Sequence, residues 1–177
     1  NIAKNYISKG AAGLIDFSCP KVSSLERSKL ISDYLEIYKK NLFINTHLFN
    51  GISEVIDTLV SKNIKWGIVT NKPSYLVLPI IEMLNFTHVP NCIVAGDTLS
   101  VKKPNPEPLI YASKQISIDP IFCAYVGDDL RDIVAANAAK MFSVAAAYGF
   151  ISDTNQIKEW ESDYIIDSPL DLKNLIS

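Results

Sequence analysis

The sequence has 177 residues, 48% of them hydrophobic, which is enough for one buried core and a small accessory unit. Its net charge of -2 excludes the strongly basic surface that binds nucleic acid. Its apolar stretches are too short to cross a bilayer, and its polar first ten residues do not resemble a signal peptide. The sequence therefore predicts a cytoplasmic protein without nucleic-acid or membrane partners.

The three cysteines are too far apart for a metal-binding or redox motif. Cys19, Cys92 and Cys123 are odd in number, and no pair has the spacing of such a motif. We expect buried free thiols in a reducing compartment.

Residues 1–45 have helical periodicity and no strand pattern. One helix is predicted over Ala11–Phe17, opened by Gly10. A second is predicted after the N-cap candidate Ser23, with apolar residues at helical spacing over Leu30–Tyr38. This region is therefore predicted to be a small helical unit.

From residue 46 onward, helix and strand patterns alternate. The predicted helices are 52–60, 76–84, 106–115 and 130–139, and the predicted strands are 64–70, 92–95, 122–126, 142–146 and 164–166. Alternation with nearly continuous apolar strands predicts a parallel sheet covered on both faces. In such sheets, ligands bind beyond the carboxyl ends of the strands.

Thr70-Asn71-Lys72-Pro73 follows the first predicted strand. A hydroxyl, an amide and backbone N–H groups meet there, and they can bind a phosphate oxygen. Thr70 and Asn71 are therefore candidate substrate-binding residues. The alternative is an ordinary turn between a strand and a helix.

Lys103 follows the second predicted strand and stands just before a helix that opens with proline. A lysine held there with little freedom can neutralise a phosphoryl group or a carboxylate. The alternative is a solvated pair of lysines, Lys102 and Lys103, before a capped helix.

Three aspartates follow the third predicted strand. Asp128, Asp129 and Asp132 come after Gly127, which permits a sharp turn. Their mutual repulsion is relieved by a hard cation, and Mg²⁺ takes one or two carboxylates with water and phosphate oxygens. The alternative is a helix start that favours acidic residues.

A hydroxyl, a lysine and acidic residues at successive strand ends suit phosphoryl transfer with Mg²⁺. In these positions the sequence resembles the haloacid dehalogenase-like superfamily. The second, third and fourth motifs correspond to 69–73, 96–109 and 126–139. The Asn-Lys-Pro continuation is similar to phosphoglycolate phosphatases. The tail, 146–150 and 163–169, is as similar to phosphatases of N-acetylmuramic acid 6-phosphate.

This resemblance implies an α/β fold with two parts. Residues 46–177 would form a Rossmann-like core with a parallel sheet, and residues 1–45 would form most of an all-helical cap that closes over the site and selects the substrate.

The resemblance also implies roles for individual residues. Thr70 would bind the transferring phosphoryl group, and Lys103 would hold that group and the nucleophile. Asp128 would ligate Mg²⁺, with support from Asp132. The cap would bring Lys9 and Gly10 to the substrate.

One family motif has no counterpart here. The first motif of the family is Asp-x-Asp, whose first residue is the nucleophile and whose second is the general acid, but this chain contains no Asp-x-Asp. Family members carry that motif on the central strand, between the strands that end at Thr70 and at Gly127. We therefore expect a core without its first strand. The chain would be a cleaved product that still binds its N-terminal segment, a truncated form, or a chain whose sheet has closed up or recruited a strand.

Two functions stay open. The first is a phosphoric monoester hydrolase acting on 2-phosphoglycolate or a sugar phosphate such as N-acetylmuramic acid 6-phosphate, through an aspartyl-phosphate whose nucleophile is not in this chain. The chain alone would then be inactive. The second is a catalytically inactive relative that binds a phosphorylated ligand or a protein. A gene that encodes Asp-x-Asp would favour the first.

Overall fold

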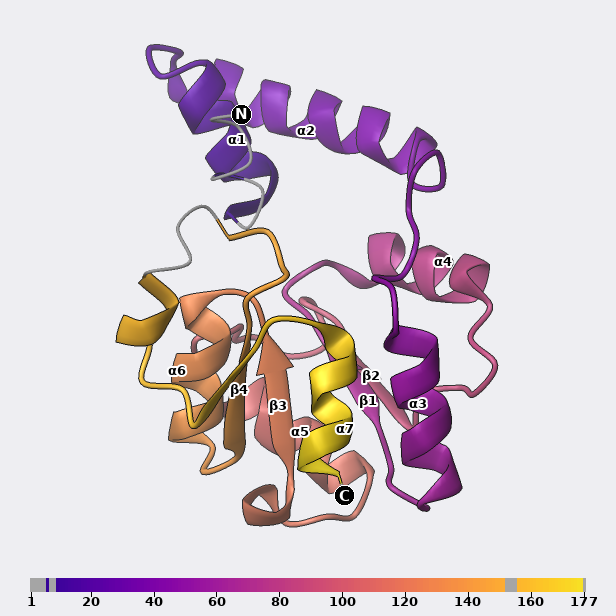
Figure 1. Ribbon diagram of the computed structural model, residues 1–177. Helices are drawn as coiled ribbons and strands as arrows, with labels where there is room; N and C mark the ends of the chain where they lie inside the picture. Colours follow the sequence, from indigo (N-terminus) through magenta and orange to yellow (C-terminus); the bar gives the residue numbers. More distant parts are fainter. Residues whose placement is uncertain (1–5, 7–8, 152–155, 177) are drawn as a thin grey trace. The chain divides into compact units, whose positions relative to one another are not determined.

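A computed structural model describes residue 6 and residues 9–151 and 156–176 (Figure 1). The chain divides into two compact units between Thr46 and His47, and Phe150 and Ile151 are grouped with the first unit. Part of the predicted cap, residues 1–5, 7 and 8, lies outside the described residues. Within the described ranges, no helix combines the length and apolar character needed to cross a membrane.

The first unit contains the helices α1 (Gly10–Ser18) and α2 (Ser24–Lys40). A capping box opens α2: the Ser23 hydroxyl accepts from the Glu26 N–H at 3.3 Å, and the Glu26 carboxylate accepts from the Ser23 N–H at 3.1 Å. Arg27 of α2 donates to Asp16 of α1 at 2.9 Å, which ties the two helices together. No side chain of either helix is fully buried.

The second unit alternates helices and parallel strands. Its helices are α3 (Ile52–Ser61), α4 (Ser74–Leu84), α5 (Glu107–Gln115), α6 (Leu130–Ala138) and α7 (Leu172–Leu175), with short 3-10 turns at Pro120–Phe122, Gln156–Glu159 and Pro169–Asp171. Its strands are β1 (Gly67–Val69), β2 (Cys92–Val94), β3 (Ala124–Gly127), β4 (Phe142–Ala146) and β5 (Tyr164–Ile166).

The strands form two parallel sheets, not one. β1 pairs with β2, and a second sheet has the order β3-β4-β5. Among the described residues, β1 and β3 do not pair with each other. The prediction of a parallel α/β core interrupted between these two strands is confirmed, and the alternative that the sheet has closed up is wrong.

Neighbouring residues of β3 pack on opposite faces, as strand geometry requires. Tyr125 packs with Val69 against a core cluster of α5 and α6 that includes Leu109. Val126 packs on the other face, against a cluster with Leu172 of α7. Each face of β3 is therefore packed against other elements, with α5 and α6 on one side and α7 on the other.

Two strands begin later in the sequence than predicted. The first was predicted over 64–70, but β1 covers Gly67–Val69, because β2 offers it only three paired residues. The third was predicted over 122–126, but β3 begins at Ala124. Phe122 belongs instead to a 3-10 turn, which Asp119 caps by accepting from the Ile121 N–H at 3.2 Å.

Asp97 caps α4 from a distant loop. Its carboxylate accepts from the Ser74 N–H at 2.8 Å and from the Ser74 hydroxyl at 2.7 Å. The hydroxyl bond first, and then the N–H bond, lower the pKa of Asp97 below its ordinary value.

Asp97→Ala is expected to lower the Tm at pH 7 by a few degrees, because the start of α4 loses its cap. Since the folded-state pKa is depressed, this stabilisation is present above the ordinary Asp pKa and is lost as the pH falls through the folded-state pKa. Thermal melts of wild type and variant should therefore converge in acid. Asp33→Ala, at an exposed carboxylate of α2, is the control. An Asp97→Ala deficit that is independent of pH would contradict this account.

Candidate functional site

The candidate site lies where β1, β2 and β3 end. Thr70 follows β1, and its N–H donates to the carbonyl of Val94, the last residue of β2, at 2.9 Å. The Thr70 hydroxyl oxygen accepts from the Lys72 N–H at 3.1 Å. This bond fixes the hydroxyl at the turn and leaves its proton available for donation.

Asn71 clamps the backbone of Lys103. Its amide nitrogen donates to the Lys103 carbonyl at 3.0 Å, and its amide oxygen accepts from the Lys103 N–H at 3.0 Å. The side chain was predicted to contact substrate, and the structure instead places it as a link between the loops after β1 and β2. Substrate binding by Asn71 stays a prediction.

The Lys103 ammonium has three oxygen partners. It lies 2.8 Å from Asp132 Oδ1, 2.6 Å from the Tyr125 hydroxyl and 3.0 Å from the Val69 carbonyl. The Lys103 side chain is only 9% exposed, so water contributes little to holding the charge. The three partners fix the ammonium at the carboxyl end of β1.

Tyr125 completes this cluster from β3. Its hydroxyl donates to the Val69 carbonyl at 2.9 Å, and its ring centroid lies 5.2 Å from Lys103 Nζ. Burial, together with the nearby carboxylates of Asp132 and Asp128, raises the pKa of Tyr125 well above its ordinary value. The phenol therefore stays protonated and acts as a hydrogen-bond donor.

The three aspartates after β3 have different surroundings. Asp129 is the N-cap of α6; it accepts from the Arg131 N–H at 3.0 Å and forms an ion pair with the Arg131 guanidinium at 2.8 Å. Asp132 uses Oδ1 for Lys103, and its Oδ2 accepts from the Asp129 N–H at 3.2 Å. The ordinary helix start that was kept as an alternative describes Asp129 well.

Asp128 lies against Gly149, which follows β4 by three residues. A Cβ atom added to Gly149 would overlap the Asp128 side chain, so only glycine leaves room for that carboxylate. Next to it, burial and then the charge of Asp128 raise the pKa of Tyr148. The Asp128 side chain is therefore half-buried and packed against Gly149.

The other predicted site residues belong to the first unit. Lys9 is the N-cap of α1 and Gly10 is its first residue, and both are exposed. The Lys9 ammonium lies 4.8 Å from the centroid of the Tyr6 ring. A substrate contact by this pair stays a prediction.

The described residues do not form a complete metal site. Nowhere in that part of the chain do three or more His, Cys, Asp or Glu side chains gather as a metal ion would require. A divalent cation at Asp128 would therefore take most of its ligands from water and a bound phosphate, as Mg²⁺ commonly does.

Sequence reasoning missed two residues of this site, Tyr125 and Gly149. Tyr125 could have been noticed, because a phenol in a buried strand needs a partner for its hydroxyl. Gly149 could not, because its contact with Asp128 joins positions that are far apart in the sequence.

A family model and curated relatives match most of this chain. The model of the haloacid dehalogenase-like hydrolase family matches residues 16–146. An N-acetylmuramic acid 6-phosphate phosphatase from Pseudomonas putida is 32% identical over 99% of this chain and 79% of its own. A phosphoglycolate phosphatase from Xanthomonas campestris pv. campestris is 35% identical over 92% of this chain and 74% of its own.

A solved structure has the same fold. The crystal structure of a predicted phosphoglycolate phosphatase from Haemophilus somnus 129PT superposes with a TM-score of 0.88, over 99% of this chain and 81% of the other. The two sequences are 24% identical, so this likeness bears on the fold alone.

Proposed function

This chain belongs to the haloacid dehalogenase-like hydrolase family. We propose that it is part of a phosphatase that hydrolyses a phosphate ester of a small metabolite. The substrates named for its relatives are phosphoglycolate and N-acetylmuramic acid 6-phosphate. Both are small phosphate monoesters, and we propose one of this class as the substrate. The free thiols of all three cysteines fit a reducing compartment such as the cytoplasm.

One observation carries the proposal: a buried ammonium is fixed among three oxygen atoms where the strands end. Lys103 can neutralise charge on a transferring phosphoryl group without moving, because Asn71 holds its backbone and Asp132 holds its ammonium. The Thr70 hydroxyl would donate to a phosphoryl oxygen at the same end of β1.

The nucleophile would come from a segment outside this chain. The 177 residues contain no Asp-x-Asp. In the proposed reaction, a carboxylate oxygen of that segment bonds to phosphorus while the ester P–O bond breaks, and the second aspartate protonates the leaving alcohol. Water then hydrolyses the aspartyl-phosphate to inorganic phosphate and restores the carboxylate.

Mg²⁺ is the proposed cofactor, with Asp128 as its ligand from this chain. The fit is partial, because Asp132 already contacts Lys103 and the N–H of Asp129. Asp132 would therefore support the cation site through Lys103 and the loop at Asp129. When bound, the cation would neutralise charge on the phosphoryl oxygens.

The inactive relative is the second candidate function. It would bind a phosphorylated ligand at the fixed Lys103 ammonium, because holding an anion there requires no nucleophile. Measuring the hydrolysis of a phosphate ester distinguishes the two functions.

We expect the isolated chain with Mg²⁺ to release no p-nitrophenol from p-nitrophenyl phosphate above the buffer rate. We call the chain together with a segment containing Asp-x-Asp the completed protein. It should hydrolyse this ester and one of the two metabolites named for its relatives. Turnover by the isolated chain, with its mass verified, would disprove the external nucleophile. A folded, completed protein that hydrolyses none of these esters would favour the binding module.

A further inference from the structure

We propose that Asn50 is a site of spontaneous deamidation, and that opening of the turn before α3 controls its rate. Asn50-Gly51 is the only Asn-Gly pair in the 177 residues. Asparagine is a thermolabile residue, and a glycine after it offers a backbone nitrogen that no Cβ atom of its own residue shields. The modification itself does not depend on the proposed function.

The reaction needs only the chain and water. The Gly51 nitrogen gives its proton to solvent and bonds to the side-chain carbonyl carbon of Asn50, while the C–N bond of the side-chain amide breaks and ammonia leaves. Water then opens the cyclic imide at either carbonyl, to give aspartate or isoaspartate. One carboxylate replaces a neutral amide, so the net charge changes from -2 to -3.

Both reacting groups are accessible. Asn50 is exposed at the end of the loop that leads into α3. Among the described residues, neither its side-chain amide nor the Gly51 N–H has a hydrogen-bond partner. No bond to either reacting group therefore has to break before they meet.

The fold requires the glycine that makes the pair reactive. Gly51 has a φ of 93°, in the left-handed region that side chains disfavour. A Cβ atom added to Gly51 would lie 2.8 Å from Leu170 Cγ and 3.0 Å from Leu170 Cδ2. A larger residue that would slow imide formation is therefore excluded at this position.

The turn opposes ring closure. The Phe49 carbonyl accepts from the Ile52 N–H at 3.1 Å, and Gly51 has φ 93° and ψ -12°, close to the third residue of a type II turn. The second residue of such a turn has a ψ of about +120°, which turns the Gly51 nitrogen away from the Asn50 side chain. Imide formation therefore requires rotation about the Cα–C bond of Asn50 and loss of the Phe49–Ile52 bond.

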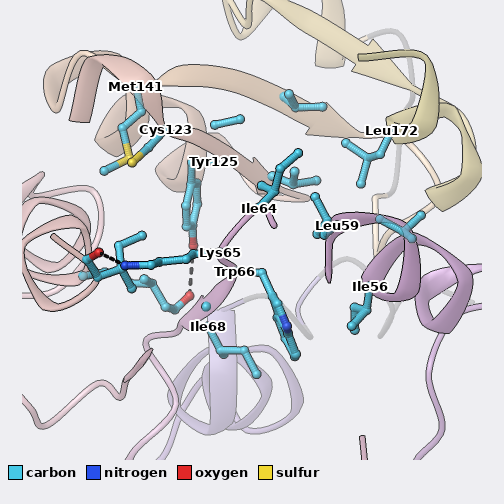
Figure 2. Close-up of a pocket in the computed structure, with 18 of the residues that line it drawn as sticks. Ile56, Leu59, Ile64, Lys65, Trp66, Ile68, Cys123, Tyr125, Met141 and Leu172 are labelled. Atoms are coloured by element: carbon cyan, nitrogen blue, oxygen red, sulfur yellow. Dashed lines mark hydrogen bonds between the residues drawn. The ribbon is translucent and has the colours of Figure 1, made fainter. Parts of the chain in front are cut away.

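Packing holds α3 in place behind this turn. Val55 and Ile56 are buried. Figure 2 shows Ile56 and Leu59 of α3 and Leu172 of α7 at an apolar cavity of about 940 Å³ between the two sheets. A change in the length of the main chain at residue 50 would therefore be absorbed by the turn, not by the helix.

The turn is connected to the candidate site through Phe49. Its ring packs edge to face on Tyr148, with 5.2 Å between the centroids, and the charge of Asp128 contributes to the raised pKa of Tyr148. Isoaspartate adds a methylene group to the main chain directly after Phe49. We expect this to move Phe49 from Tyr148 and to lower the activity of the completed protein, an effect that rests on the proposed function.

The test incubates the folded isolated chain at mildly alkaline pH beside a synthetic peptide of residues 46–55. Mass spectrometry of the digested chain, with chromatography that separates aspartate from isoaspartate, follows residue 50. We expect both products at Asn50, formed about 5-fold more slowly than in the peptide, the factor for first breaking one ordinary hydrogen bond. An unmodified Asn50 in the chain would overturn the proposal.

The chain supplies its own controls for the glycine. Asn63 and Asn85 are also exposed but are followed by Ile64 and Phe86, so they should stay unmodified. Asn50→Gln should stay unmodified too, because its longer side chain closes a larger and less favourable ring. Conversion of Asn63 or Asn85 as fast as that of Asn50 would show that Gly51 has no part in the reaction.

A pair of leucine variants tests the control by the turn. Leu170→Ala removes the side chain that packs against Gly51, so modification of Asn50 should approach the rate of the peptide. Leu78→Ala, at an exposed leucine of α4, should leave the rate unchanged. Thermal melts verify that both variants are folded. Equal rates in the chain and the peptide, or equal effects of the two variants, would overturn the role of the turn.

Activity of the completed protein separates this inference from the phosphatase proposal. Aged wild type should lose activity in proportion to its isoaspartate fraction, and equally aged Asn50→Gln should not. If Asn50 is converted but the fresh protein hydrolyses no ester, the modification stands and the phosphatase proposal falls. Full activity of a sample rich in isoaspartate would overturn the effect on the site.

Discussion

Lys103→Met is expected to lower the free energy of unfolding by about 3–5 kcal/mol, because it leaves the Asp132 carboxylate buried without its cation. Asp132 is a buried residue, and its Oδ1 lies 2.8 Å from the ammonium. The Val69 carbonyl loses one of its two donors in the same step. For a chain of this size the Tm should fall by roughly 10 °C. Urea denaturation with an unchanged m-value is the measurement.

Lys102→Met is the matched control for this experiment. Lys102 is the preceding residue and is exposed, so its replacement should change the free energy by no more than about 0.5 kcal/mol. Lys103→Met/Asp132→Asn should be more stable than the single lysine variant, because the unpaired charge is removed with its partner. Equal losses for Lys102→Met and Lys103→Met would show that the ion pair does not stabilise the core.

Asp128→Asn is expected to reduce kcat/KM of the completed protein by about 10³-fold, since the proposed Mg²⁺ ligand is lost. Stability should change little, because asparagine has nearly the same volume and fits the same space against Gly149. The residual activity should no longer respond to Mg²⁺. Initial rates over a Mg²⁺ titration, together with thermal melts, provide both readouts.

Asp129→Asn tests whether Mg²⁺ binding is specific to Asp128 or shared with the neighbouring carboxylate of Asp129. Asparagine also caps helices well, so Asp129→Asn should lose only the ion pair with Arg131, at a cost of less than about 1 kcal/mol, and keep the Mg²⁺ response. Similar activity losses in the two variants would mean that both aspartates serve the cation. A full loss for Asp129→Asn alone would reverse the assignment.

Asp128 and Asp129 show which part of the site can be predicted from the sequence. Their position after an apolar strand and a glycine predicted both a helix start and a cation site, and the family resemblance assigned the cation to Asp128. The division comes from partners: Arg131 lies on the Asp129 carboxylate, whereas Asp128 lies against Gly149. The contact of Asp128 with Gly149 is distant in the sequence, so the short motif contains no information about it.

The sequence by itself determined the alternating α/β order, the parallel sheet and the strand ends at which Thr70, Lys103 and Asp128 stand. The spacing of apolar residues and the positions of glycine and proline between elements are local properties, so they can be recognised in the sequence alone. The interruption between β1 and β3 was predicted from the family resemblance, because the chain lacks the Asp-x-Asp motif that the family carries on its central strand. Strand lengths were less well predicted, since pairing and capping partners decide where Gly67 or Ala124 begins a strand.

Only the tertiary structure decided how Lys103 is held. Asn71 forms hydrogen bonds with its backbone, and Asp132 and Tyr125 contact its ammonium. None of these contacts can be predicted from the spacing of residues in the sequence. The tertiary structure also kept the two sheet edges apart around an apolar cavity. α5 packs on β1 and α6 packs on β3, and that packing depends on side chains from the whole core, not on either strand alone.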